Sequence, residues 1–191
     1  MGFWETVFGR SKPSKPQTER FFDLATAEVT LQTALGWRSA GRAGLCLKMV
    51  SSGDFAEADR EATELVQFAA REMESGVSVE QDPYGYRWFV ISDTDFGDLV
   101  TLIHMIAGEL IDHGYGSQLL AAAFRFRCGD ADSDVAYLIY SYKRGSFYPF
   151  VPRTGKQRAN ELELRAGALL GNELPWEGEI TRWYALWDLP V

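Results

Sequence analysis

The sequence predicts an α+β fold: a single domain with a short N-terminal arm, built on a mostly antiparallel sheet flanked by helices. Apolar residues make up 46% of the 191 residues and aromatic residues 14%, which is enough for a sizeable core. Segments with strand-like patterns follow one another through short turns, as antiparallel neighbours do. Helical patterns separate these blocks of strands. This order is typical of α+β proteins, in which helices pack on a sheet made of neighbouring strands.

The first residues of the chain differ in composition from the rest. We expect residues 1–16 to form an arm and residues 17–191 to form the domain. A helix at the start of the arm would carry one apolar stripe, made of Phe3, Trp4, Val7 and Phe8. A basic linker with two prolines follows at 10–16. We interpret the stripe as an anchor for a partner groove or an anionic membrane surface, with packing on its own domain as the alternative.

Apolar residues at helical spacing predict four helices, at 17–35, 54–73, 99–111 and 157–170. Helix 54–73 has the clearest pattern, with Asp54 as its expected N-cap and Leu65 among the apolar residues of its buried face. Its acidic cluster is interpreted as a solvated face. Before the third helix, Asp95 is the expected N-cap and Asp98 lies in the favourable first turn. This capping accounts for the DTDFGD segment better than a calcium loop does, because the spacing and final glutamate of such a loop are missing.

Strands are expected at 44–50, 77–79, 86–91, 119–127, the first half of 135–152, and 146–150. Segment 135–152 organises the others. Its first half is apolar on both alternating sets of positions, which is typical of a strand buried on both faces. Gly145 can adopt the positive φ of the following turn, and two prolines then place the returning strand at an edge. The aromatic segment 176–191 is expected to fold back on the body, since its rings are costly to leave in water.

Charge and cysteine usage exclude several classes of protein. The net charge of −8 is opposite to what nucleic-acid binding requires. Cys46 and Cys128 lie in apolar runs without CxxC spacing, which predicts buried free thiols and a reducing, cytoplasmic location. The sequence has no apolar stretch near the ~20 residues that span a bilayer. It also lacks the order of residues typical of a signal peptide.

The sequence contains no motif that carries catalysis. A GxSxG elbow, a P-loop and a dinucleotide-binding glycine pattern are all missing. His104 and His113 do not have the spacing of metal ligands. We therefore predict no catalytic residue, no metal site and no cofactor. Two alternatives stay open: a small hydrolase-like enzyme with a cleft near His104 and His113, and an oligomeric structural protein whose aromatic tail forms the subunit contact.

The remaining candidate is a docking surface at the tip of the hairpin in 135–152. Two cations and three aromatic residues lie close together there: Lys143, Arg144, Phe147, Tyr148 and Phe150. A cation over an exposed ring contributes about 0.5–1 kcal/mol, and arginine and aromatic residues dominate interface hot spots. We predict that these five residues bind a partner. In the alternative interpretation the rings belong to the core and the cations keep the tip soluble.

Several short segments resemble the PspAB family, whose members are associated with phage shock protein A. They are MGFW followed by GRSKP, KRGSFYPF, LELR and RWYALW, and they extend over nearly the whole chain. The resemblance implies a non-enzymatic cytoplasmic accessory of the cell-envelope stress response, peripheral at the inner face of the membrane. Its main partner would be the coiled-coil, membrane-maintaining phage shock protein A. The resemblance also implies a functional link to a membrane zinc metalloprotease of the HtpX type. It implies no catalytic residue.

Overall fold

The computed structural model of this protein describes residues 21–131 and 134–191. Six strands form one antiparallel sheet in the order β2-β3-β1-β4-β5-β6. In chain order the strands are β1 (Arg38–Lys48), β2 (Gly76–Gln81), β3 (Tyr86–Ser92), β4 (Leu119–Arg127), β5 (Val135–Ser141) and β6 (Ser146–Phe150). The predicted α+β class is confirmed. The predicted edge position of β6 is confirmed as well.

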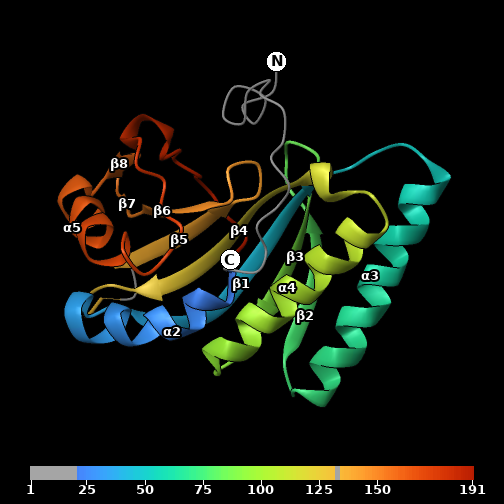
Figure 1. The fold of residues 1–191 in the computed structure, drawn as a ribbon, viewed down its shortest axis with the longest axis horizontal. Coiled ribbons are helices and arrows are strands. Elements are labelled where there is room, and N and C mark those ends of the chain that lie inside the picture. Colours follow the sequence, from blue (N-terminus) through green and yellow to red (C-terminus); the bar gives the residue numbers. More distant parts are fainter. Residues whose placement is uncertain (1–20, 132–133) are drawn as a thin grey trace.

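Helices cover one face of this sheet. They are α2 (Asp23–Thr30), which continues as the π-helical turn η2 (Leu31–Leu35), α3 (Gly53–Glu72) and α4 (Phe96–Asp112). Figure 1 shows α2, α4 and α3 side by side across the sheet, while α5 (Asn160–Leu170) lies next to β6. Short elements complete the fold: η3 (Gly116–Gln118), β7 (Pro152–Arg153), β8 (Gln157–Arg158) and η4 (Ile180–Arg182).

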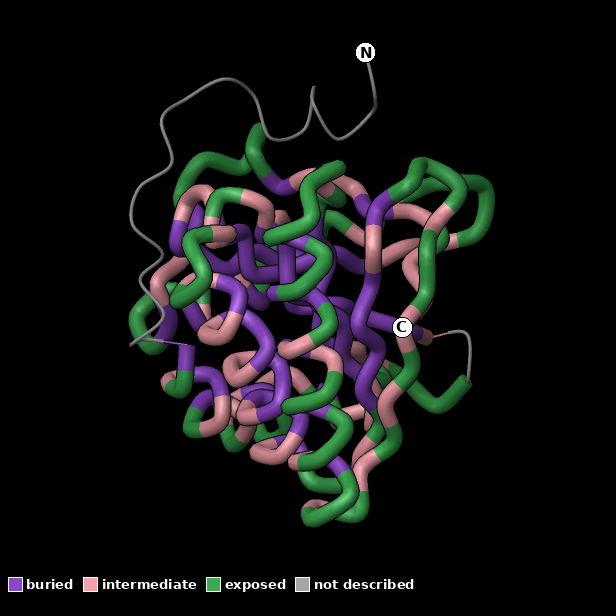
Figure 2. Tube along the Cα trace, turned by 90° about the vertical axis from the view of Figure 1, so that its right-hand side faces the viewer, coloured by how far each residue is buried: buried purple, intermediate pink, exposed green. Residues whose placement is uncertain are grey.

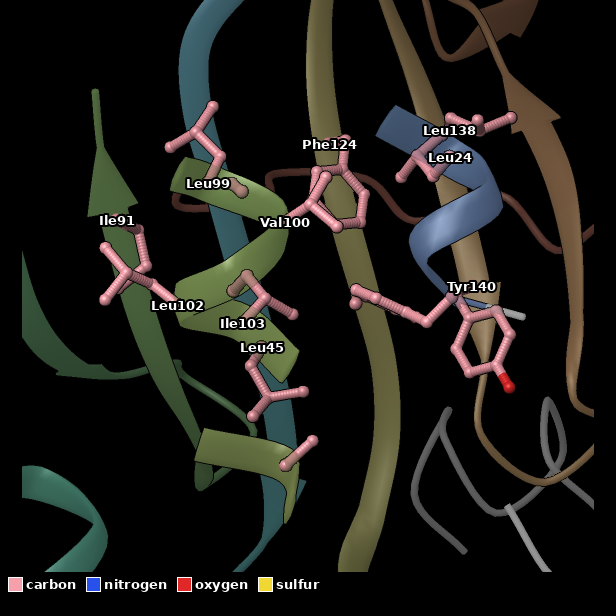
Figure 3. Packing of buried hydrophobic residues seen from close by; sticks show 14 of the residues in the cluster. Leu24, Leu45, Ile91, Leu99, Val100, Leu102, Ile103, Phe124, Leu138 and Tyr140 are labelled. Atoms are coloured by element: carbon pink, nitrogen blue, oxygen red, sulfur yellow. The ribbon is translucent and has the colours of Figure 1, made fainter. Parts of the chain in front are cut away.

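The main core lies between the helices and the sheet. In Figure 3 the α4 side chains Leu99, Val100, Leu102 and Ile103 lie among apolar residues of β1, β3 and β4, and Leu24 of α2 lies near β5. All seven residues of β5 are buried, as predicted for a strand covered on both faces. Figure 2 shows the buried segments running through the middle of the molecule and exposed residues along the outer turns.

The second face of the sheet is covered by the C-terminal segment 175–191, here called the tail. Trp183, Leu186 and Val191 are buried against apolar residues of the strands, so the predicted return of this aromatic segment is confirmed. Gly44 of β1 leaves room for the end of the tail, because a Cβ there would lie 2.5 Å from Val191 Cγ1. The tail also pairs with the outer edge of β6: Phe147 N donates to Pro175 O at 2.7 Å, and Glu177 N donates to Phe147 O at 2.9 Å.

Some element boundaries differ from expectation. Ser52, and not Asp54, caps α3, because its hydroxyl accepts a hydrogen bond from Phe55 N at 3.2 Å. Strand β1 begins at Arg38, well before the expected residue 44, since its polar start pairs with β4 across a bulge. The last helix begins at Asn160, because Gln157 and Arg158 pair with β7. Asp95 caps α4 as predicted and accepts hydrogen bonds from Gly97 N and Asp98 N.

Candidate functional site

The hairpin tip between β5 and β6 is fastened to the tail. Gly145 has a φ of 65°, as predicted for this turn. Arg144 Nη2 donates to Tyr184 Oη at 3.3 Å, and Arg144 Nε lies 3.7 Å from a carboxylate oxygen of Glu177. Glu177 is itself only 7% exposed. Lys143 is half-buried, and burial lowers the pKa of its ammonium group. Arg144 therefore acts as an internal link between the hairpin and the tail in this structure.

The three aromatic residues of the hairpin are buried: Phe147 is 0% exposed, Tyr148 1% and Phe150 1%. Alternate side chains of a strand point to opposite faces of the sheet. Phe147 therefore enters the helix-covered core, where its ring centroid lies 6.0 Å from that of Phe21. Tyr148 and Phe150 face the tail, and Phe150 meets Trp187 edge to face at 5.0 Å. The three rings are therefore not exposed in this structure, and partner binding by the five hairpin residues stays a prediction. The interpretation of the rings as core holds.

The other predicted binding residues, Phe3, Trp4, Val7 and Phe8, lie outside the described residues. Their role as an anchor stays a prediction.

The two histidines lie in different environments along α4 and do not converge on a cleft. His104 is half-buried beside the N-terminal part of α2, with its ring 4.6 Å from that of Phe22, and burial lowers its pKa. His113 follows the last residue of α4 and faces α3, where its Nε2 lies 2.9 Å from a carboxylate oxygen of Glu61. The structure therefore gives no support to an enzyme built on these two residues together.

Glu61, Glu109 and His113 bring one oxygen or nitrogen atom each within 4.8 Å of one another. One imidazole and two carboxylates could hold a divalent transition metal. In this structure both carboxylates pair with His113. His113 Nδ1 is 3.0 Å from the backbone oxygen of Glu109 and 3.4 Å from its carboxylate. This cluster fixes the end of α4 against the middle of α3.

Protonation of His113 should make the fold more stable in weak acid. The hydrogen bond to the Glu109 carbonyl, with added attraction from Glu61 and Glu109, raises the pKa of His113 above its ordinary value. A raised pKa means that the contribution is fully present below about pH 6.5 and is lost as the pH rises through the pKa of the folded state. We expect His113→Gln to lower the free energy of unfolding more at pH 6 than at pH 8, measured by urea denaturation.

His104→Gln is the matched control for this pH effect. The pKa of His104 is lowered, so its own contribution to stability rises with pH and has the opposite sign. His104 and His113 are the only histidines in the chain, so the two variants together cover every histidine. An equal loss of stability at both pH values in His113→Gln would contradict a protonated link between α3 and α4.

The outward face of α3 carries two large apolar side chains. Phe68 is 60% exposed and Leu65 36%. Helix α3 is fixed to the sheet from its other side, where Asp59 forms an ion pair with Arg87 of β3 at 2.7 Å. The helical spacing of the sequence predicted that Leu65 lies on the buried face and did not single out Phe68. Helical spacing alone does not define the width of the buried stripe. Single exposed apolar residues are common, but two neighbours on one turn form a patch.

These two residues belong to a regular stripe on the helix. Positions Glu61, Leu65, Phe68 and Glu72 are separated by four, three and four residues. This is the spacing of the a and d positions in a coiled coil, so the four side chains lie in one line along the helix. Glu57 and Glu64 lie beside the line and are exposed. We call this set of six residues the α3 stripe: an apolar centre with acidic ends and an acidic flank.

The comparison with protein families identifies the chain. The family PspAB, described as PspA associated protein B, matches residues 1–191. The chain belongs to the PspAB family. The resemblance carried by the short segments of the sequence is thereby confirmed. Searches of the curated proteins and of the solved structures find no match to this PspAB chain.

The family description associates PspAB proteins with PspA, which is consistent with an accessory role. In the part of this PspAB chain that the structure describes, the helices are too short or too polar to cross a membrane.

Proposed function

We propose that this PspAB chain is a non-enzymatic accessory protein of the cell-envelope stress response and that it binds PspA through the α3 stripe. The observation that carries the proposal is the exposure of Leu65 and Phe68 at coiled-coil spacing in a family associated with PspA. PspA is a coiled-coil protein, and helices of this kind present apolar residues at the complementary spacing. A helix lying along α3 would cover both side chains.

The chemistry of the stripe favours a helix with basic flanks. Complete burial of a phenylalanine or leucine side chain contributes about 1.5–3 kcal/mol, and Phe68 and Leu65 still expose 60% and 36% of their surfaces. The exposed carboxylates of Glu57 and Glu72 would pair with lysine or arginine at the edges of the partner helix, whereas Glu61 pairs with His113 and Glu64 with Arg60 within the chain. Such rim charges add more to the rate of association and to the choice of partner than to affinity.

The proposal places the protein where PspA acts, in the cytoplasm at the inner face of the membrane. The apolar stripe of the N-terminal arm would then add an anchor to an anionic membrane surface. A functional link to an HtpX-type membrane protease belongs to the same proposal and needs no direct contact.

Charge substitution in the α3 stripe tests the interface. We expect the double variant Leu65→Glu and Phe68→Glu to bind purified PspA about 30-fold more weakly or worse, as for the loss of one interface hot spot of about 2 kcal/mol. Binding is measured by titration calorimetry. Leu164→Glu is the matched control, since Leu164 is 50% exposed on α5 and lies outside the stripe. Unchanged PspA binding by the double variant would remove α3 from the interface.

A further inference from the structure

A pocket of about 240 Å³ opens on the tail-covered side of the sheet, between the β2–β3 turn and the tail. Its aromatic walls come from Tyr84, Trp88 and Trp187. Asp82, Asp188 and Lys156 supply its charged groups. This pocket lies apart from the α3 stripe and from the hairpin tip and belongs to neither of these surfaces.

The walls of the pocket are held in place by their own contacts. Trp88 is 1% exposed, and its Nε1 donates to an Asp82 carboxylate oxygen at 3.1 Å. The other oxygen of Asp82 accepts hydrogen bonds from Tyr84 N and Tyr86 N, both at 2.9 Å. Trp187 packs edge to face on Phe150. Tyr84, at the tip of the turn, is 66% exposed. The pocket is therefore a preformed aromatic floor and wall with one exposed ring at its edge.

The size and lining of the pocket favour a short extended peptide. Pockets for drug-sized ligands and cofactors measure about 300–1,000 Å³, which is larger than this one. Grooves lined by tryptophan and tyrosine bind proline-rich segments, whose polyproline II helix is already ordered before binding. Two carboxylates against one ammonium group leave a net negative rim, which selects basic residues next to the prolines.

This chain carries such a segment in its own arm. Residues 10–16 read RSKPSKP, so Pro13 and Pro16 are three residues apart. A polyproline II helix has three residues per turn, which places both prolines on one side and both Lys12 and Lys15 on another. The charge of this part of the chain is opposite to that of the rest: residues 1–20 carry a net charge of +2 and the remaining residues a net charge of −10.

We infer that Pro13 and Pro16 bind in this pocket, either of the same chain or of a second copy, with Lys12 and Lys15 directed to Asp82 and Asp188. Phe21 lies in the core between the helices and the sheet, whereas Trp88 lies on the tail-covered face, so an arm of the same chain has to pass round the sheet to reach the pocket. The chain from Pro13 to Phe21 can extend about 26–29 Å along such a path. A second copy offers the same pocket without that limit.

Nuclear magnetic resonance of the indole N–H groups in the full chain tests the inference. In the variant Pro13→Ala and Pro16→Ala, we expect the Trp88 and Trp187 signals to move. The Trp37 signal should stay, because Trp37 lies in the other core and is 1% exposed. Dilution of the unchanged chain separates the two arrangements: signals that move on dilution indicate a second copy, and constant signals indicate the same chain.

A synthetic peptide of residues 9–18 provides the reciprocal measurement. Added to the double proline variant, it should return the Trp88 and Trp187 signals towards their original positions, and the same peptide with both prolines replaced by alanine should not. Tyr84→Ala in that variant should weaken peptide binding about tenfold, since aromatic residues dominate such contacts. The inference is overturned if the double proline variant leaves both signals in place. It is equally overturned if an unrelated proline-rich peptide binds and the chain's own peptide does not.

Discussion

Replacement of Glu163 by alanine is expected to destabilise the fold by about 3–5 kcal/mol, the usual cost of removing one partner of a buried ion pair. Glu163 is 2% exposed, and its two carboxylate oxygens lie 3.0 and 3.1 Å from Arg158 Nε. It also accepts a hydrogen bond from Val151 N at 2.7 Å. Its loss would leave Arg158 without its carboxylate partner and this backbone N–H without its acceptor. Urea denaturation followed by circular dichroism measures the change.

The effect should be large because Arg158 joins three parts of the molecule. Besides Glu163 of α5, it donates to Pro149 O of β6 and to Trp183 O of the tail. Glu161→Ala is the matched control, since Glu161 lies in the same first turn of α5 but is exposed. It should cost no more than about 0.5 kcal/mol, like other surface changes. Similar losses for the two variants would show that the ion pair does not hold these parts together.

The elements that the sequence predicts correctly are those whose pattern lies within a few consecutive residues. The apolar spacing in α4, the cap at Asp95 and the positive φ at Gly145 are each determined within a few residues, and each is confirmed. The start of β1 is not local: Arg38 and Ser39 are polar and become a strand by pairing with Arg127 and Phe126 of β4. The β7–β8 hairpin is likewise too short to leave a periodic pattern.

The burial of the hairpin rings depends on long-range packing, which explains why the sequence pattern alone does not predict it. Aromatic residues and cations around a turn are equally consistent with a docking face and with the edge of a core. Contacts from Phe21 and Trp187, both far away in the sequence, decide in favour of the core. On α3 the periodicity gives the direction of the buried face, but the exposure of Leu65 is decided by how closely neighbouring elements approach.

Replacement of Trp183 by alanine should destabilise the fold by about 3–5 kcal/mol, as for other large-to-small changes of buried aromatic residues. Trp183 is 6% exposed, and its Nε1 donates to Glu177 O at 2.8 Å. Its ring packs on α5 so closely that a Cβ at Gly167 would lie 3.1 Å from it. The ring also meets Trp176 edge to face at 6.0 Å. Removing it would leave a cavity between the tail and α5, detectable by urea denaturation.

Ile180→Ala separates this effect from a general sensitivity of the tail, because Ile180 lies three residues earlier in the sequence and is 55% exposed. We expect a loss of no more than about 0.5 kcal/mol for it. Trp183→Ala keeps the backbone carbonyl that accepts from Arg158 but removes the ring that holds this part of the tail on α5, so the double variant Glu163→Ala and Trp183→Ala should deviate from additivity by about 0.5–3 kcal/mol. Strict additivity, together with a small effect of Trp183→Ala, would mean that the tail covers the second face of the sheet without stabilising it.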